Sequence, residues 1–547
     1  MKIKKQFITL SIITMIACPA LLKSQQRAGF PDALFTRAEK SQYTETSLSR
    51  DVREFVNTLD RLSDLVSVET TGTSKGGNPL QLVILARPGI STPDEAHASG
   101  KPVVYIEANI HAGEVEGKEA VLQLMREIAF GPKTYLLDNQ IILFCPNFNP
   151  DGNDKLGENR PSQDGSPKLT GVRSSGEGLD LNREGMKLEA IEVKALVKNV
   201  FLRWDPVLFM DMHTDNGSWH GYAVNFAPSF HTVGQPEVTQ YTRKLLQAAE
   251  DRITERSGVP TWWHGYYRVQ RDGQAKYTAY SHLPRYLVNS VGLRNRMGIL
   301  SETFAHMNFE KRVWSNYLEV ESILEYTNDH AGEIVKLIRD ADRKTVETIK
   351  SNDGTLEKGV RYKLTTTPDT VSILVRETKP YTDRRGRRRS KPTGRTYWKD
   401  SVLLYNSFEP VKKSKVPRAY LIPAVQTDAI QKLQEHGITL TQLNRRARFT
   451  GEEYRITGIQ QNKRAAYGGH KSLTLTGSFF PAKRTFPAGT YLLDMAQPLA
   501  WLAFYLLEPE SDDGLVYWNY FDHPLLDQGK KKQTYPVFKL FKLPDDL

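Results

Sequence analysis

The feature that most constrains the fold is an alternation of short apolar runs with longer amphipathic stretches between about residues 30 and 350. Two of the amphipathic stretches, residues 118–131 and 236–258, have helical spacing and end at a glycine, which is a helix stop signal. Five apolar runs are predicted to be buried strands, at residues 79–87, 101–110, 139–147, 205–213 and 296–304. Strands that alternate with helices predict an α/β domain.

The length and a change of pattern predict a second domain. A chain of 547 residues exceeds one ordinary hydrophobic core. Beyond about residue 355 the pattern changes to short strands, turn residues and basic loops, interrupted by one helical stretch at residues 427–437. We therefore predict an α/β domain over residues 30–350 and an appended β-rich accessory domain over residues 355–547.

The N-terminus has the features of a secretory signal. A Lys-rich start precedes an apolar stretch from Phe7 to Ala17, which is too short to span a membrane, and the chain then turns polar. We predict a signal peptide over residues 1–24 and an exported protein, periplasmic or extracellular. The sequence MIAC resembles the lipobox of bacterial lipoproteins, so the mature chain either is lipid-anchored through Cys18 or begins at Gln25 after ordinary cleavage.

Export and the cysteine content restrict the partners. The chain has two cysteines, and the assignment of Cys18 to the signal region leaves Cys145 without an intrachain partner. Cys145 lies in an apolar run and is predicted to be a small buried residue. An exported chain is not expected to bind nucleic acid, and no later segment is apolar for long enough to be a transmembrane segment.

The basic charge is unevenly distributed. The formal net charge is +11, and much of the excess lies between Arg384 and Arg389, with Lys391 and Arg395 nearby. Because like charges repel and stay exposed, we expect a solvated loop between two strands. The functional alternative is contact with anionic cell-envelope polymers.

The tetrapeptide HAGE occurs twice, from His111 to Glu114 and from His330 to Glu333. The second copy lies in a pattern typical of one long amphipathic helix, and a solvated helix surface is its expected environment. The first copy directly follows a predicted strand. Only the first copy is therefore a candidate for a functional site.

Polar side chains follow several of the predicted strands. His111 and Glu114 follow one strand, His213 ends another, and Glu302 lies near the end of a third. Because ligands of open α/β sheets bind beyond the carboxyl ends of the strands, these groups are expected at one rim. Two His and one Glu, with a fourth position left to water, form the ligand set of a catalytic zinc site. Zinc lowers the pKa of its bound water from ~15.7 towards ~7, and Glu302 is the candidate general base.

Five motifs together resemble the zinc carboxypeptidases, the family that includes pancreatic carboxypeptidase A. In chain order they are HAGE, NPDG, GLDLNRE, DMHT and SETF, and the resemblance covers about residues 40 to 345. It implies a mixed, mostly parallel sheet flanked by helices. It also implies a zinc metallopeptidase that hydrolyses C-terminal peptide bonds of peptides or peptide-like substrates with a free carboxylate.

The resemblance assigns roles to individual residues. It implies one Zn²⁺ bound by His111, Glu114 and His213, with Glu302 as the general base. Asp180 matches the carboxylate that orients the first zinc histidine from behind. The pair that binds the terminal carboxylate of the substrate is matched by Asn182 and Arg183, and a guanidinium suits this task because it can donate two parallel hydrogen bonds.

Two further roles have competing candidates. The arginine that stabilises the developing oxyanion is matched by Arg160 or Arg173, with Arg160 preferred. The tyrosine that closes over the substrate is matched by Tyr280 or Tyr286, and the spacing before Glu302 favours Tyr280. The chain also departs from the family by placing Glu184 directly after Arg183, where the family usually has asparagine.

These observations predict an exported zinc metallocarboxypeptidase that attacks with a zinc-bound water. One alternative is a zinc amidase or endopeptidase that acts on cell-wall peptides, a reading favoured by the envelope location and by Glu184. The other is a non-catalytic envelope-binding protein with a vestigial metal site, in which the basic, aromatic C-terminal region is the working part.

Overall fold

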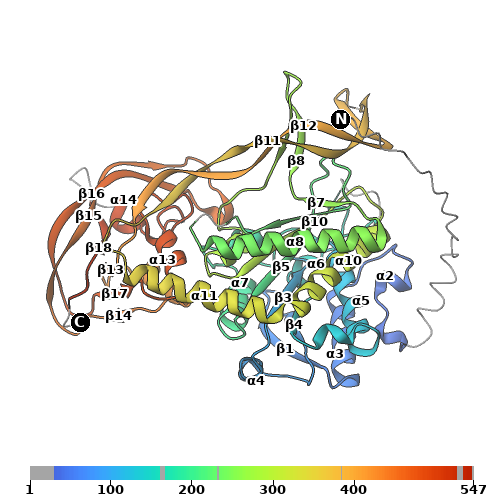
Figure 1. The fold of residues 1–547 in the computed structure, drawn as a ribbon, viewed down its shortest axis with the longest axis horizontal. Coiled ribbons are helices and arrows are strands. Elements are labelled where there is room, and N and C mark those ends of the chain that lie inside the picture. The colour runs from blue at the N-terminus through green and yellow to red at the C-terminus, as the bar shows by residue number, and fades with distance from the viewer. Residues whose placement is uncertain (1–29, 161–166, 231–232, 384, 527–533, 545–547) are drawn as a thin grey trace, which may run out of the picture.

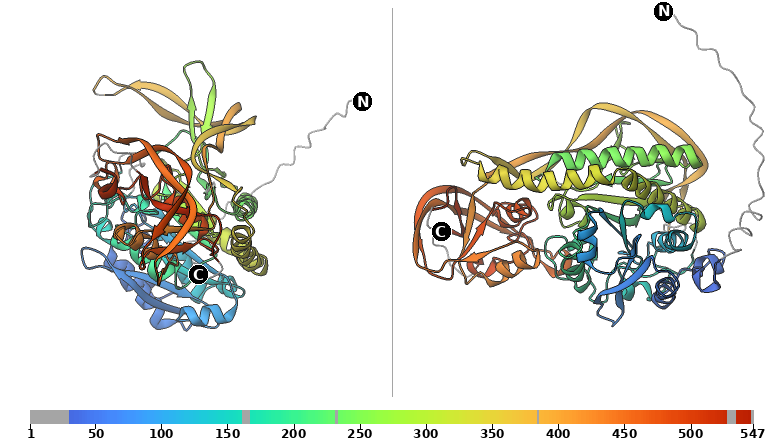
Figure 2. Two further views of the ribbon diagram at one scale, coloured as in Figure 1. Left: turned by 90° about the vertical axis from the view of Figure 1, so that its left-hand side faces the viewer. Right: turned by 60° about the horizontal axis from the view of Figure 1, so that its bottom comes forward.

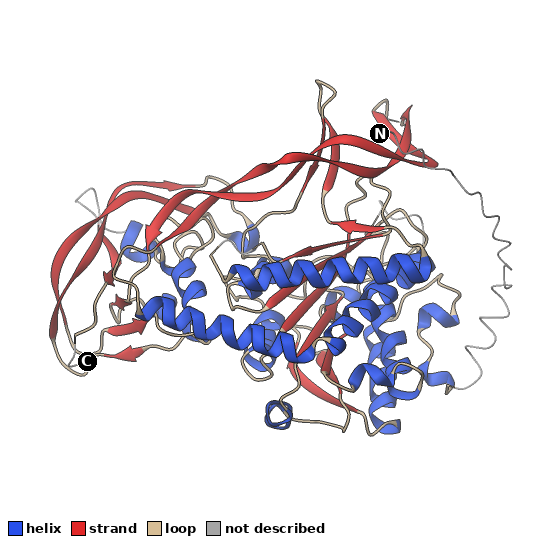
Figure 3. Cartoon of the chain, viewed as in Figure 1, coloured by secondary structure: helices blue, strands red, loops and turns tan. Residues whose placement is uncertain are grey.

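The computed structural model describes residues 30–160, 167–230, 233–383, 385–526 and 534–544 (Figure 1). The predicted signal peptide and Cys18 lie outside these residues. An α/β body occupies the N-terminal part of the chain, and a smaller region of long strands follows it (Figure 3). None of the helices within the described ranges has both the length and the apolarity that a membrane span requires.

The α/β body is built on one eight-stranded mixed sheet with the order β1-β2-β4-β3-β5-β10-β6-β7. The four central strands, β4-β3-β5-β10, are parallel to one another, whereas β1, β2 and β6 join antiparallel. The strands are β1 (Val66–Thr73), β2 (Pro79–Leu85), β3 (Val103–Ala108), β4 (Ile141–Cys145), β5 (Leu208–Thr214), β6 (Val224–Pro228), β7 (Thr261–Trp263) and β10 (Met297–Thr303). The predicted α/β fold with a mixed, mostly parallel sheet is confirmed, as are all five predicted strands.

Helices cover both faces of this sheet, which explains why its central strands are continuous apolar runs. Along β3, Val104 and Ile106 pack into one core with the long helices, while Val103 and Tyr105 pack into a second core on the opposite face. The first face is covered by α3 (Ser49–Leu62), α5 (Glu116–Phe130), α8 (Pro236–Ser257), α10 (Phe309–Asp329) and α11 (Ala331–Lys350). The second is covered by α4 (Pro93–Ser99), α7 (Ile191–Leu196), the π-helical segment Val197–Phe201 and α9 (Leu287–Gly292). Cys145 is buried and unpaired in the second core, as predicted.

The second HAGE copy lies on a helix surface, but its helix is not continuous. The pattern predicted one long helix, whereas the structure has a break at His330, whose φ of −115° and ψ of 20° are not helical. His330 Nδ1 lies 3.5 Å from Glu333, whose side chain is 56% exposed. Glu333 also accepts a hydrogen bond from Tyr241 and lies near Lys244. This copy therefore forms a surface ion-pair cluster.

The C-terminal region contains a six-stranded sheet with the order β14-β17-β13-β18-β15-β16. Its strands are β13 (Ala419–Ile422), β14 (Thr441–Gln442), β15 (Ala447–Gln461), β16 (Leu473–Phe486), β17 (Tyr491–Asp494) and β18 (Thr534–Leu540). The predicted helix is α12 (Thr427–Glu435). The appended β-rich region is thus confirmed.

One buried helix of this region was not predicted. Helix α13 (Ala500–Leu507) is apolar on every side, so it has none of the periodicity that identifies a surface helix. All eight of its residues are buried, and Trp501 and Phe504 belong to the core of the C-terminal region. The aromatic residues near the C-terminus are therefore mainly core residues, together with Trp518 and Phe521.

A long antiparallel ribbon of β11 (Glu357–Thr382) and β12 (Arg388–Lys415) runs between the two regions (Figure 2). Strand β12 pairs in parallel with β9 (Ala275–Thr278), which pairs with β8 (Tyr266–Val269) of the α/β part. The ribbon crosses the predicted division, so the exact domain boundary stays a prediction. The described residues of the basic run lie at the exposed end of this ribbon, including Arg385, Arg387, Arg388, Arg389, Lys391 and Arg395.

Candidate active site

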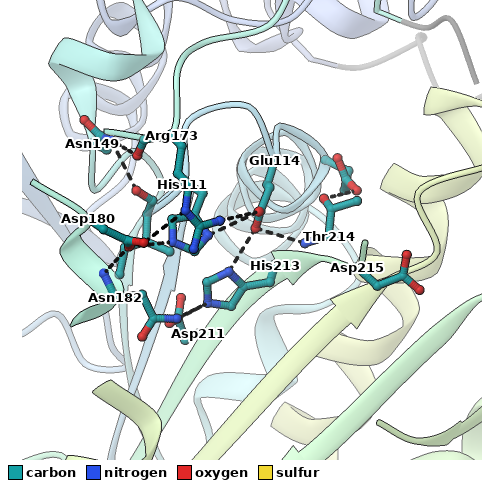
Figure 4. Close-up of polar contacts among 12 residues, drawn as sticks. His111, Glu114, Asn149, Arg173, Asp180, Asn182, Asp211, His213, Thr214 and Asp215 are labelled. Carbon is teal, nitrogen blue, oxygen red and sulfur yellow. Dashed lines mark hydrogen bonds and ion pairs between the residues drawn. The ribbon is translucent and has the colours of Figure 1, made fainter. Parts of the chain in front are cut away.

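Three side chains from two strand ends meet at the carboxyl edge of the sheet. His111 and Glu114 lie in the turn between β3 and α5, and His213 lies on β5, the neighbour of β3 (Figure 4). One ligand atom of each lies within 4.8 Å of the others, and all three residues are buried. Within the described ranges, no other group of at least three His, Cys, Asp or Glu residues could bind a metal ion in this way.

Two donor–donor distances in this His-Glu-His cluster are close to those of a tetrahedral ion site. Nδ1 of His111 lies 3.1 Å from Oε1 of Glu114, and Nδ1 of His213 lies 2.9 Å from Oε2. With metal–ligand bonds of ~2.0–2.1 Å, donors around a tetrahedral zinc are about 3.3 Å apart. The residues present therefore fit a zinc ion.

Carboxylates orient both imidazoles toward the cluster. Nε2 of His111 lies 3.0 Å from Asp180, and Nε2 of His213 lies 2.7 Å from Asp211. An Nε2–H that donates to a carboxylate leaves the Nδ1 lone pair free for a metal. Asp180 was predicted in this role, but Asp211 was not. The sequence did contain a sign of this second contact. Residues two apart on a strand lie on the same face, and Asp211 precedes His213 by two positions.

The electrostatics of the cluster favour a bound cation. Burial opposes ionisation of Glu114, but His111 and Arg160 outweigh it and hold the pKa of this carboxyl well below its usual range. Burial likewise lowers the pKa of His213, yet Asp211 and Glu114 overcome this effect and raise it well above normal. Glu114 is thus a buried carboxylate whose ionised form is stabilised by its neighbours, and a divalent ion would stabilise it in the same way.

Glu302 lies opposite His213 on the adjacent strand. It occupies β10, and its Cα is paired with that of His213 in the parallel register, so the two side chains share one face of the sheet. Oε2 of Glu302 is buried and has no hydrogen-bond partner among the described residues. Burial raises the pKa of Glu302 to about 8. A buried carboxyl with a free oxygen beside the cluster has the properties of a general base.

Both arginine candidates reach the cluster. Arg160 donates from Nη1 to Glu114 at 2.6 Å and from Nη2 to the backbone carbonyls of Thr214 and Asp215. Gly113 permits this approach, since a Cβ there would lie 2.8 Å from Cγ of Arg160. Arg173 is more exposed, donates to Asp180 at 3.0 Å and lies 3.7 Å from Glu114. The choice between the two stays a prediction.

The residues predicted to bind a substrate carboxylate adjoin the cluster. The backbone N–H of Asn182 donates to Asp180, and its side-chain amide lies 3.1 Å from Nε2 of His213. Arg183 follows directly, and its Nη1 donates to the carbonyl of Asn182 at 2.6 Å. The Nε of Arg183 is buried and has no hydrogen-bond partner in the described part of the chain. A guanidinium with an unused donor beside the cluster is available to an anionic ligand.

Glu184 does not oppose a carboxylate at Arg183. It is fully buried and paired with Lys187, whose side chain is also buried. Its Oε2 accepts hydrogen bonds from the backbone N–H groups of Glu189 and Ala190, at 2.6 and 3.0 Å, ahead of α7. The negative charge of Glu184 is thus neutralised by Lys187 inside the protein.

The two tyrosine candidates have different environments. The buried hydroxyl of Tyr280 lies within hydrogen-bond distance of two acceptors, the carbonyl oxygen of Pro228 at 3.1 Å and Oδ1 of Asn289 at 2.9 Å. The ring of Tyr286 packs edge-on against Tyr280 and contacts Arg183, whose Cζ lies 4.4 Å from the ring centroid. Tyr286 is therefore the one of the two that directly contacts the predicted carboxylate site.

Comparison with known proteins agrees with this geometry. Residues 52–184, which include His111, Glu114 and Asp180 to Arg183, match the model of the family described as zinc carboxypeptidase. This stretch of the chain is therefore similar to the zinc carboxypeptidases. Together with the curated carboxypeptidase relatives, this similarity indicates a zinc metallopeptidase.

Relatives of this chain include curated fungal and animal proteins. Carboxypeptidase 2 of Trichophyton rubrum is 24% identical over 82% of this chain and 78% of its own length. Carboxypeptidase E of Caenorhabditis elegans is 30% identical over 24% of this chain and 28% of its own length. Among solved structures, a metallo-carboxypeptidase from Burkholderia cenocepacia is 21% identical, with a TM-score of 0.38 over 52% of this chain and 69% of that one.

The carboxylates behind the histidines should control metal affinity. Asp211→Asn preserves the size of the side chain but removes the negative charge that fixes the Nδ1 lone pair of His213. We expect zinc affinity to fall by about 10- to 100-fold. Competition with a fluorescent zinc chelator measures this change. Asp205→Asn is the control, because Asp205 is an exposed residue paired with Arg296 before the same strand. Equal zinc affinity in Asp211→Asn and the parent protein would contradict the assignment.

Proposed function

We propose that this enzyme is a metallocarboxypeptidase that uses one zinc ion to remove the C-terminal residue from peptides. The observation that supports it best is the convergence of the His-Glu-His cluster, Glu302 and Arg183 at one edge of the sheet. When bound by His111, Glu114 and His213, zinc would lower the pKa of a water and polarise a carbonyl. The remaining steps belong to side chains of this chain.

Glu302 is proposed as the general base and then the general acid. It takes a proton from the attacking water and passes it to the nitrogen of the departing amine. Its burial suits this cycle, since a carboxyl with a raised pKa both accepts and returns a proton near neutral pH. Arg160, or Arg173 in its place, donates hydrogen bonds to the oxyanion that develops on the scissile carbonyl.

Arg183 is proposed to bind the terminal carboxylate, with Asn182 beside it. The guanidinium is a fixed cation, and its side chain is 12% exposed, so a carboxylate there is partly desolvated and its hydrogen bonds are strong. Binding at Arg183 places the last peptide bond near Glu302 and the cluster. This arrangement distinguishes a carboxypeptidase from an endopeptidase, which accepts chains without a free carboxylate.

Hydrolysis of N-acetyl dipeptides tests this function directly. We expect chelator-sensitive release of the C-terminal amino acid that returns when zinc is added. We also expect each C-terminal amide to be cleaved at least about 10²-fold more slowly than its acid, because the amide leaves Arg183 unpaired. Equal cleavage of acids and amides, or activity on cell-wall peptides alone, would indicate the amidase or endopeptidase. Protein purified without stoichiometric zinc and inactive after zinc addition would indicate a binding protein.

Export and a polymer partner are further proposals. The apolar stretch from Phe7 to Ala17 after a Lys-rich start supports a periplasmic or extracellular enzyme, either soluble or anchored through Cys18. The exposed arginines at the end of the β11–β12 ribbon support contact with anionic cell-envelope polymers. Tyr397 and Trp398 on the same ribbon are 48% and 62% exposed and would add apolar contact area.

A further inference from the structure

The predicted carboxylate site contains a residue from the C-terminal region. The ring of Tyr467, in the connection between β15 and β16, lies with its centroid 4.9 Å from Cζ of Arg183. Tyr286 contacts the same guanidinium from the α/β body. Arg183 therefore has two aromatic neighbours, and one of them comes from the C-terminal region rather than from the α/β body.

The segment that follows Arg183 is bound by three separate parts of the C-terminal region. Lys432 of α12 donates to the carbonyl of Leu188 at 2.8 Å. His470, three residues after Tyr467 in the connection, lies 2.9 Å from Glu189. The hydroxyl of Tyr520 donates to the carbonyl of Lys187 at 3.0 Å. These contacts hold the C-terminal region in a defined position against the segment that follows the 3-10 helix Leu181–Arg183.

The opposite side of the site is also bound by the C-terminal region. The guanidinium of Arg285 forms a buried ion pair with Asp513 at 2.8 Å, and its backbone N–H donates to the same carboxylate. His282 lies 3.2 Å from Asp512. Because Arg285 directly precedes Tyr286, these pairs position the second aromatic neighbour of Arg183. The C-terminal region thus determines both sides of the site.

A tight turn presents Tyr467 to Arg183. Gly468 and Gly469 have φ angles of +67° and +82°, a conformation that favours glycine, and they reverse the chain before His470. His470 is fixed on both ring nitrogens, by Glu189 and by Asn519 at 3.0 Å. Tyr467 itself is 41% exposed, so its ring contacts Arg183 and also faces solvent.

We propose that Tyr467 is a positioning residue for substrate binding, by which the C-terminal region completes the carboxylate subsite. The inference rests on the proposed role of Arg183. An aromatic face against a guanidinium stabilises the cation and restricts its orientation, while N–H groups in the plane, such as the unpartnered Nε–H of Arg183, remain available to bind a carboxylate. The ring also shields the ion pair from water, which strengthens it. The appended region is therefore part of the substrate site of this enzyme.

Binding of simple carboxylates to the zinc-loaded full chain tests this proposal. The ligands are N-acetyl-phenylalanine, N-acetyl-lysine and N-acetyl-glutamate with their α-amides, measured by calorimetry. Tyr467→Ala should raise the Kd of the acid that binds best by about 3- to 30-fold. It should leave amide binding unchanged, because an amide forms no ion pair with Arg183. For hydrolysed dipeptides, KM should rise with little change in kcat.

Two variants serve as controls. Tyr467→Phe retains the ring and removes only the hydroxyl, which also hydrogen-bonds to Arg183, so its Kd for the acids should lie closer to that of the parent protein than to that of Tyr467→Ala. Tyr381→Ala removes another tyrosine that is 41% exposed and also contacts a cation, Lys391, but on the ribbon. It should change neither Kd nor KM. Thermal melting establishes that all three variants are folded.

The outcomes separate this inference from the proposed function. Acid binding by Tyr467→Ala equal to that of the parent overturns the inference even if the enzyme is an active carboxypeptidase. A parent protein that does not distinguish acids from amides also overturns it. If no peptide is hydrolysed but Tyr467→Ala weakens acid binding selectively, the subsite is correct and the proposed reaction is wrong.

Discussion

Glu302→Gln should reduce kcat by about 10²- to 10⁴-fold while zinc content stays at one ion per chain. The amide has the size of the carboxyl but cannot accept a proton from water. Because Glu302 lies opposite His213 rather than among the three cluster residues, its replacement removes no proposed ligand. Steady-state hydrolysis of an N-acetyl dipeptide, with zinc measured by atomic absorption on the same samples, checks both parts.

Glu319→Gln is a matched control for this prediction. Glu319 is a fully buried glutamate whose pKa is likewise raised by burial to about 8. It lies on α10, however, and accepts a hydrogen bond from Ser301, the residue before Glu302. We expect Glu319→Gln to hydrolyse peptides at a rate close to that of the parent protein. A Glu302→Gln enzyme with near-normal turnover would show that another group acts as the base.

His213→Gln should abolish stoichiometric zinc binding and with it peptide hydrolysis. The variant removes one of two imidazole donors from the cluster, and the remaining pair cannot complete a zinc site with three protein ligands. A metal stabilises the transition state by several kcal/mol. Its loss should therefore lower kcat by at least about 10³-fold. Added zinc at micromolar concentration should not restore activity. Metal analysis after dialysis and a zinc titration of activity measure these effects.

His220→Gln provides the comparison for His213→Gln. His220 lies close in sequence and is equally buried, but its Nε2 pairs with Asp215 at 2.8 Å and it is outside the cluster. We expect His220→Gln to keep one zinc ion, with a loss of stability as its main effect, since Asp215 loses a buried partner. One tightly bound zinc in His213→Gln would exclude the proposed ligand set.

Several features of the fold could be predicted because they depend on local pattern. The strands β3, β4, β5 and β10 are buried on both faces, so each is an unbroken apolar run, and its boundaries were predicted to within a few residues. Polar groups directly after such runs were expected at one rim, because parallel strands end on the same side. His111, Glu114 and His213 do meet there.

Other features could not be predicted in this way. Helix α13 is buried on all sides, so it shows no periodicity, and the break at His330 has no glycine or proline at that position. Asp211 was not recognised as a partner of His213, although its position in β5 would have allowed it. Tyr280 and Tyr286, the two candidates for the tyrosine at the substrate site, are distinguished by the contact of Tyr286 with Arg183. These two residues are about a hundred positions apart in the sequence, so no local pattern reveals the contact.

The sequence by itself determined the chemistry of this protein: two histidines, a glutamate and Glu302, each at the end of an apolar strand. The tertiary structure decided what surrounds that chemistry, including Asp211 behind His213, Lys187 against Glu184, and Tyr467 against Arg183. The physical reason is the range of the interactions. Burial and periodicity act between near neighbours and are visible in a segment, whereas the contact between Arg183 and Tyr467 exists only after two distant parts of the chain have packed together.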